Sequence, residues 1–248
     1  RWLPWDAPLA AFESADRVVL RSTWDYIHRV DDFLLFCDAM GPRLVNPPGV
    51  VRWNAHKGYL LDLDRAGLAV VPTELVRRGT PGSLAALAAK RGFGMLVVKP
   101  AVGAGSFATR RIDGRAPTAE DERFFTEVVA ARDVLVQPYV RSVETSGERS
   151  LVTIGGEVTH AIRKTARFDG DHEAVSAAAL PVADDERAFA EQACAIARRL
   201  TGTDHLAYAR VDLARDDSDR PLLMELELIE PSLFFSRRPS AIERFLDV

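Results

Sequence analysis

Three carboxylates in the second half of the chain occur where a β-hairpin would bring them onto one face. Residues 205–213 and 221–229 are predicted strands joined by a polar turn, with Asp212 on the first and Glu225 and Glu227 on the second. Because side chains alternate along a strand, Asp212 is expected opposite Glu225, with Glu227 on the same face. Such close acids repel one another unless a cation binds between them. Magnesium is the expected ion, since it prefers carboxylate, phosphate and water oxygens.

The same register adds a basic residue to this face. With the turn centred between Ser218 and Asp219, Arg210 faces Glu227, where its guanidinium could stabilise a phosphoryl group during transfer. The alternative is an exposed strand whose acids are merely hydrated. We reject that alternative because intervening positions such as Leu226 are apolar, which makes the acidic face the polar side of a packed sheet.

A lysine followed by a small-residue loop provides a second signal. Residues 95–99 predict a buried strand that ends at Lys99, and Gly103, Gly105 and Ser106 follow it. An ammonium group beside unhindered backbone N–H groups suits phosphate oxygens. The lysine precedes the glycines, so this is not a Walker A loop, and alone it would more often be an ordinary turn.

Two weaker signals accompany it. Lys57 lies in a predicted helix and, by itself, would more often be a solvated surface lysine. A predicted strand ends at Gln137 and Pro138, followed by Tyr139 and Val140. A strand that stops at proline leaves main-chain groups without ladder partners, as adenine binding requires, although an ordinary strand exit gives the same pattern.

The elements around these residues predict an α+β fold in which helices pack on mixed sheets. Other expected strands cover residues 18–20, 68–71, 134–137, 150–154 and 157–162. Helices are expected to begin at Asn54, Ser83, Thr118 and Ala188.

Composition narrows the class of protein. The 248 residues carry a formal net charge of −4, with basic and acidic residues interspersed, so we expect neither nucleic acid nor an anionic membrane as a partner. No apolar run approaches the roughly 20 residues of a membrane span. Two isolated cysteines, Cys37 and Cys194, favour a cytoplasmic location over a disulfide framework. The chain begins and ends within apparent elements, so we expect the natural protein to extend further at both ends.

In their order along the chain, these motifs resemble the ATP-grasp superfamily, with a layout similar to glutathione synthetase. The resemblance covers about residues 21–232 and implies two α+β subdomains, 49–140 and 141–248, that grip ATP behind an incomplete N-terminal α/β domain, 1–48. It implies that ATP is contacted by Lys57, Lys99, Gly103, Gly105, Ser106, Gln137, Pro138, Tyr139, Val140 and Glu148. It implies that magnesium, or manganese in its place, is bound by Asp212, Glu225 and Glu227.

A narrower group of ATP-grasp ligases is similar in three further segments, residues 20–26, 52–54 and 225–232. That group includes the cyclo-ligase that closes O-ureido-D-serine to D-cycloserine in antibiotic biosynthesis. The resemblance implies a ligase that activates a carboxylate as an acyl phosphate for attack by nitrogen, with a small amino-acid-like substrate. Residues expected to bind that substrate are Arg21, Asp25, Tyr26 and Ser232. A local salt bridge is the alternative for the first two.

Three residues are expected to act in catalysis: Lys99, Arg163 and Arg210. Lys164 is a further candidate, with plain surface charge as its alternative, and His172 lies in an expected lid at 169–173. Two departures from the family are visible: Glu227 stands where asparagine is commoner, and Ser150 where glutathione synthetase has a basic residue.

Two other functions stay open at this point. One is an intermolecular amino-acid or peptide ligase, and the other is a regulatory module that binds nucleotide without chemistry. A homo-oligomer is also compatible with the sequence. The acid set argues against the regulatory module, because closely spaced carboxylates are costly without a metal.

Overall fold

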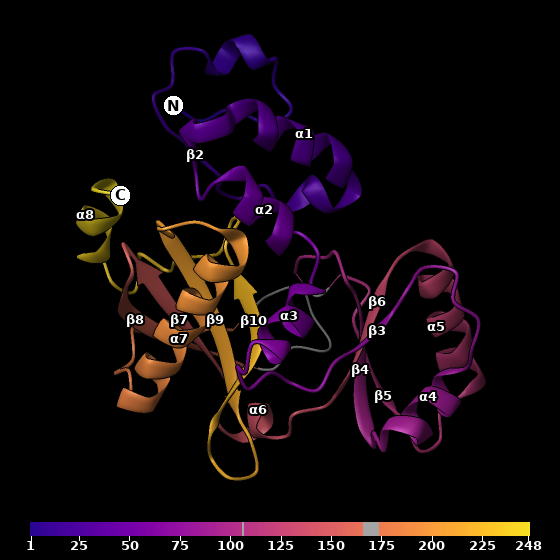
Figure 1. Cartoon of the computed structure of the whole chain (residues 1–248). Helices are drawn as coiled ribbons and strands as arrows, with labels where there is room; N and C mark the ends of the chain where they lie inside the picture. The colour runs from indigo at the N-terminus through magenta and orange to yellow at the C-terminus, as the bar shows by residue number, and fades with distance from the viewer. Residues whose placement is uncertain (106, 166–173) are drawn as a thin grey trace.

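The computed structural model describes residues 1–105, 107–165 and 174–248, and it contains two four-stranded antiparallel sheets with a cavity between them (Figure 1). The strands are β1 Val18–Val19, β2 Leu44–Val45, β3 Glu74–Val76, β4 Met95–Pro100, β5 Arg110–Asp113, β6 Val134–Pro138, β7 Glu148–Ile154, β8 Glu157–Lys164, β9 Tyr208–Arg215 and β10 Pro221–Glu227. The α-helices are α1 Val30–Met40, α2 Pro48–Asn54, α3 Tyr59–Arg65, α4 Leu84–Arg91, α5 Ala119–Ala131, α6 Ser142–Thr145, α7 Asp184–Thr201 and α8 Ala241–Leu246. The predicted α+β class is confirmed.

The first sheet has the strand order β3-β6-β4-β5 and carries α4 and α5 on one face (Figure 1). Helix α4 is capped by the Ser83 hydroxyl, and Thr118 forms a capping box with Asp121 at the start of α5. Phe125 and Val129 of α5 are buried against the strands in one apolar cluster. This packing leaves the opposite face of β4 and β6 to form one wall of the cavity.

The second sheet has the order β10-β9-β7-β8 and packs α7 against one face. Phe189, Ala193 and Ile196 of α7 join a core that also receives Leu60 and Leu63 from α3. The apolar face of each central strand therefore points at helices, and the polar face of β9 and β10 points at the cavity.

The N-terminal part consists of the parallel pair β1-β2 with α1 and α2, next to the second sheet (Figure 1). Its core is aromatic: Trp5 packs edge-on to Phe33 at 5.4 Å between ring centroids, and Tyr26 stacks on Phe33 at 4.6 Å. Ile229, just beyond β10, belongs to the same cluster, which ties the acidic strand to the N-terminal part.

The hairpin that carries the acids has a bulge that the sequence did not reveal. Near its turn Leu213 pairs with Leu223, one residue away from the expected register. The bulge at Met224 then restores the expected pairs, Asp212 with Glu225 and Arg210 with Glu227. The prediction for the acids is confirmed, whereas the predicted centre of the turn is wrong by about half a residue.

Two predicted elements are corrected. Asn54 does not start a helix: it is the last residue of α2, and the next helix begins at Tyr59. Its amide instead donates to Leu226 O and accepts from Leu228 N, both at 2.8 Å. Residues 68–71 form only a single bridge, Val70 with Leu223, rather than a strand.

The predicted domain limits at residues 48 and 140 stay a prediction. The core of the second sheet includes α3, which lies within 49–140, so the apolar clusters do not follow those limits. In the described part of the chain, no helix has the length and hydropathy needed to cross a lipid bilayer.

Asn54→Ala is expected to lower the free energy of unfolding by about 2–4 kcal/mol, because it leaves one buried carbonyl and one buried N–H of β10 without partners. Urea denaturation of the variant and the parent measures the difference. A change below about 0.5 kcal/mol would show that the amide does not secure β10.

Candidate active site

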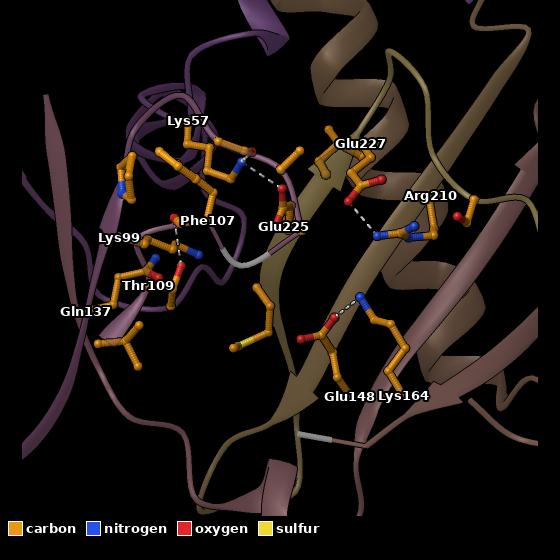
Figure 2. Close-up of a pocket in the computed structure, with 18 of the residues that line it drawn as sticks. Lys57, Lys99, Phe107, Thr109, Gln137, Glu148, Lys164, Arg210, Glu225 and Glu227 are labelled. Atoms are coloured by element: carbon orange, nitrogen blue, oxygen red, sulfur yellow. Dashed lines mark hydrogen bonds and ion pairs between the residues drawn. The ribbon is translucent and has the colours of Figure 1, made fainter. Parts of the chain in front are cut away.

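A cavity of about 650 Å³ lies between the two sheets, with the N-terminal part at one end. Figure 2 shows Lys57, Lys99 and Gln137 on one wall and Arg210, Glu148 and Lys164 on the opposite wall. Most of the residues predicted to bind ATP line this cavity, namely Lys57, Lys99, Gly103, Gly105, Gln137, Pro138, Tyr139, Val140 and Glu148. Ser106 and His172 lie outside the described residues.

The acids of β10 point into this space, and each is paired with a base. Glu225 lies 3.0 Å from the Nζ atom of Lys57, and Glu227 accepts from Arg210 at 2.5 Å (Figure 2). Both acids line the cavity, whereas Asp212 lies behind them, only 1% exposed. Acids and bases from the two walls therefore meet across the cavity, as the sequence predicts.

Asp212 is held by two cations at once. It accepts from Nζ of Lys164 at 2.7 Å and from Nε and Nη2 of Arg210 at 2.8 and 2.7 Å. Burial alone would raise the pKa of Asp212, but the charges of Arg210 and Lys164 outweigh it and hold that pKa well below its ordinary value. The carboxylate is thus ionised, and its oxygens have the charge that a metal ligand needs.

The two basic residues at the end of β8, both candidates from the sequence, face opposite sides of the sheet. Arg163 is exposed and does not line the cavity, so its prediction as a catalytic residue is wrong. Lys164 is 8% exposed, lines the cavity and forms ion pairs with Asp212 and with Glu148 on the neighbouring strand. Strand alternation explains the difference, because successive side chains face opposite sides of the sheet.

The opposite wall carries two lysines, one in an ion pair and one without an ion pair to any described residue. Nζ of Lys57 donates to Gly103 O at 2.6 Å besides pairing with Glu225, so this lysine ties the glycine loop to β10. Lys99 forms no ion pair with the described residues, and burial lowers its pKa. A buried ammonium group without a counterion is suited to an anionic ligand.

The strand exit predicted to hold adenine lines the cavity too. The side chain of Gln137 donates to Thr73 Oγ1 at 2.8 Å, which turns its amide away from the ligand space. The N–H of Tyr139 donates to Met95 O at 2.8 Å, so this donor is not free. Pro138 has no N–H, and the carbonyl of Val140 accepts from the N–H of Val143 at 3.3 Å. Among the described residues this leaves the N–H of Val140 as a main-chain donor for a base edge.

The predicted substrate residues divide into two groups. Tyr26 and Ser232 line the cavity. Asp25 does not: it is exposed and accepts a hydrogen bond from Trp5 Nε1 at 3.1 Å, so its predicted contact with a substrate amine is wrong. Arg21 lies behind the cavity, where its Nη1 is buried without a hydrogen-bond partner, and no salt bridge joins it to Asp25 in the described residues.

Glu230 is the functional candidate that sequence reasoning missed. It is 7% exposed, and its carboxylate lines the cavity three residues beyond Glu227. It lies outside the hairpin, in the segment after β10, so strand alternation could not assign its direction. The available signal was its place in a run of acids, Glu225, Glu227 and Glu230.

The donor set fits a hard divalent cation. Asp212, Glu225 and Glu227 offer carboxylate oxygens on one face of the hairpin, which is the chemistry that magnesium requires. These oxygens are engaged by basic side chains, namely Lys57, Lys164 and Arg210. Among the described residues no group of three or more acid, histidine or cysteine side chains is drawn together tightly enough to hold a metal.

Comparison with known proteins agrees with this geometry. Residues 1–46 match the family model described as the N-terminal domain of D-cycloserine synthetase DcsG. Over 241 residues the chain is 34% identical to the cycloserine biosynthesis protein DcsG of Streptomyces lavendulae, a match that covers 92% of this chain and 80% of that protein. The chain belongs to the DcsG family of ATP-grasp ligases.

Solved structures support the same assignment for this ATP-grasp ligase. The crystal structure of D-cycloserine synthetase DcsG superimposes with a TM-score of 0.86 at 32% identity, over 98% of this chain and 86% of that one. D-alanine–D-alanine ligase from Bacillus anthracis gives a TM-score of 0.65 at 15% identity, over 96% of this chain and 80% of that one, which bears on the fold alone. The predicted ATP-grasp fold and the ligase class, which forms C–N bonds, are confirmed.

Replacing Lys164 by methionine is expected to lower kcat of this ligase by about 10²- to 10³-fold, because the cavity loses a fixed positive charge. Release of ADP measures the rate. Arg163→Met is the matched control and is expected to retain parental activity, since Arg163 is exposed on the other side of β8. Thermal unfolding of both variants separates loss of charge from loss of fold, and equal activity of the two folded variants would contradict the assignment.

Proposed function

We propose that the chain is a cyclo-ligase that uses ATP to close O-ureido-D-serine into D-cycloserine. One observation carries the chemistry: Glu225 and Glu227 of β10 share one cavity with Lys57 and Lys99, and Asp212 of β9 is buried behind these acids. The substrate follows from the relationship to DcsG, a protein described as a D-cycloserine synthetase. The paired charges suit a ligand that combines phosphates with a metal.

ATP would lie with its phosphates between the two walls. Lys57 and Lys99 would contact phosphate oxygens, and the glycine loop at Gly103 and Gly105 would cover them. The main chain of residues 137–140 would hold adenine, and Glu148 would accept hydrogen bonds from the ribose hydroxyls. Glu148 already pairs with Lys164, so the lysine would hold that carboxylate in position.

Magnesium would be held by Asp212, Glu225 and Glu227, with manganese as the alternative ion. When bound, magnesium supplies positive charge to the phosphate oxygens. Glu225 and Glu227 would then exchange their present partners, Lys57 and Arg210, for the metal. The freed Lys57 ammonium and Arg210 guanidinium would face the transferring phosphoryl group, where positive charge stabilises the transition state.

The reaction needs no protein nucleophile. A carboxylate oxygen of the substrate attacks the γ-phosphorus, the bond to the bridging oxygen breaks, and ADP leaves. The nitrogen attached to the side-chain oxygen of the same molecule then attacks the acyl carbon, loses its proton and expels phosphate, which closes the ring. Water then attacks the carbonyl carbon of the carbamoyl group left on that nitrogen, the bond from that carbon to the ring nitrogen breaks, and the carbamic acid released decomposes to carbon dioxide and ammonia, which leaves D-cycloserine. The residues act by orientation and charge.

The decisive assay supplies O-ureido-D-serine as the sole organic substrate with ATP and magnesium. A cyclo-ligase is expected to release ADP and phosphate and to form D-cycloserine, identified by mass spectrometry. The intermolecular alternative requires a second amino compound before product appears. Absence of product under both conditions, with nucleotide still bound, would instead support a regulatory module. The oligomeric state stays a prediction, to be measured by light scattering.

Glu225→Gln is expected to reduce kcat by about 10³-fold or more, because it removes one metal ligand and the partner of Lys57. Binding of a fluorescent ADP analogue is expected to change little, since adenine contacts are distant from this residue. Glu120→Gln serves as control, because that acid is exposed on helix α5 and lies outside the cavity. Undiminished turnover by the folded Glu225→Gln variant would contradict the metal assignment.

A further inference from the structure

Glu230 is a buried carboxylate that lines the cavity and has no basic partner among the described residues. It is 7% exposed, and neither a hydrogen bond nor an ion pair is formed by its side chain within the described ranges. A buried charge without a partner is costly, and burial accordingly raises the pKa of Glu230. A buried carboxylate beside a ligand cavity can be stabilised by a cationic group of the ligand that binds there.

The other acids of the cavity do not share this property. Glu225 is paired with Lys57, Glu227 with Arg210, and Glu148 with Lys164. Glu230 is therefore the cavity-lining acid, among those described, that forms no ion pair. Lys57 and Arg210, whose charges act on it most strongly, are engaged by Glu225 and Glu227, and the weaker influence of Arg21 includes no salt bridge in the described residues. The carboxylate can therefore pair with a cation that a ligand brings into the cavity.

Glu230 also lies at the substrate end of the cavity. It follows β10, close in sequence to Ser232, and it lies within electrostatic range of Arg21 at the edge of the N-terminal part. Tyr26, also from the N-terminal part, lines this region. Burial raises the pKa of Tyr26 most, and the negative charge of Glu230 raises it further. Lys57, which the proposed function assigns to phosphate, acts on Glu230 through its charge but is paired with Glu225.

We infer that Glu230 binds the α-ammonium group of the amino-acid substrate, the contact that the sequence assigned to Asp25. The inference rests on the proposed function in requiring a substrate with a free amine near the carboxylate that becomes phosphorylated. An ammonium held by Glu230 leaves that carboxylate free to approach the γ-phosphate. It would satisfy the unpaired acid by a charge-assisted hydrogen bond.

The first test compares Glu230→Gln with Asp25→Asn, both of which change an acid to its amide. Glu230→Gln is expected to raise KM for O-ureido-D-serine by about 10- to 100-fold, the range of a charged hydrogen bond, with KM for ATP within about twofold of the parent. Asp25→Asn is expected to match the parent in both constants, because Asp25 lies outside the cavity. An unchanged KM in the folded Glu230→Gln variant would overturn the inference.

The second test uses 3-(ureidooxy)propanoate, the analogue that lacks the amine. Its KM is expected to be equal for the parent and Glu230→Gln, so the penalty of the substitution disappears with the ammonium. If the variant loses activity equally towards substrate and analogue, Glu230 has a structural role. If its magnesium requirement rises instead, Glu230 is a metal ligand. Either result rejects ammonium binding.

Failure of the proposed function would look different. If the parent enzyme releases no ADP with O-ureido-D-serine, the substrate assignment fails, whatever Glu230 does. Amino acids that do support ADP release, paired with their des-amino analogues, then test the ammonium contact independently. If Glu230→Gln no longer prefers the amino acid over its des-amino analogue, the ammonium contact is still upheld. If the variant prefers the amino acid as strongly as the parent does, the contact is rejected.

Discussion

The structure depends on the mutual neutralisation of charges that are buried on one face of β9 and β10. Asp212 is 1% exposed and is tolerated there because Lys164 and Arg210 surround it. Buried ions cost several kcal/mol each unless they are closely paired, so removing one member leaves its partner uncompensated. Any ligand must therefore compete with contacts that the protein already makes. Binding of a charged ligand therefore replaces one set of ion pairs by another.

Accurate placement of these charges comes from residues far away in sequence. The side chain of Asn54 bonds to the main chain of β10 at Leu226 and Leu228, in the manner of an additional strand. Asn46 does the same at Tyr208, Leu228 and Ala207. These amides connect the N-terminal part to the strands that carry the acids. The N-terminal part and the acidic strands are consequently parts of one hydrogen-bonded framework.

Sequence patterns predicted the acids and Lys99 because those signals are local. Alternation along a hairpin fixes which side chains share a face, and the bulge at Met224 compensated for the misplaced turn. Arg163 was chosen wrongly over its neighbour because the choice depends on a single step of alternation at a strand end. Asp25 and Asn54 were misassigned for another reason: their partners, Trp5 and β10, are 20 and more than 170 residues away. No local pattern encodes such contacts.

The charge balance of the cavity explains why phosphates and metal belong together. Among the described lining residues, four are basic and four are acidic, and Asp212 adds a further negative charge behind them. A triphosphate alone would add about four negative charges to a region that has no positive excess. Under the proposed function, a divalent cation bound with it would offset most of that charge and be held by the carboxylates, which would leave Lys57 and Arg210 to face the phosphates. The ion pairs of Lys57 with Glu225 and of Arg210 with Glu227 would thus keep both cations beside the place where phosphoryl transfer would need them.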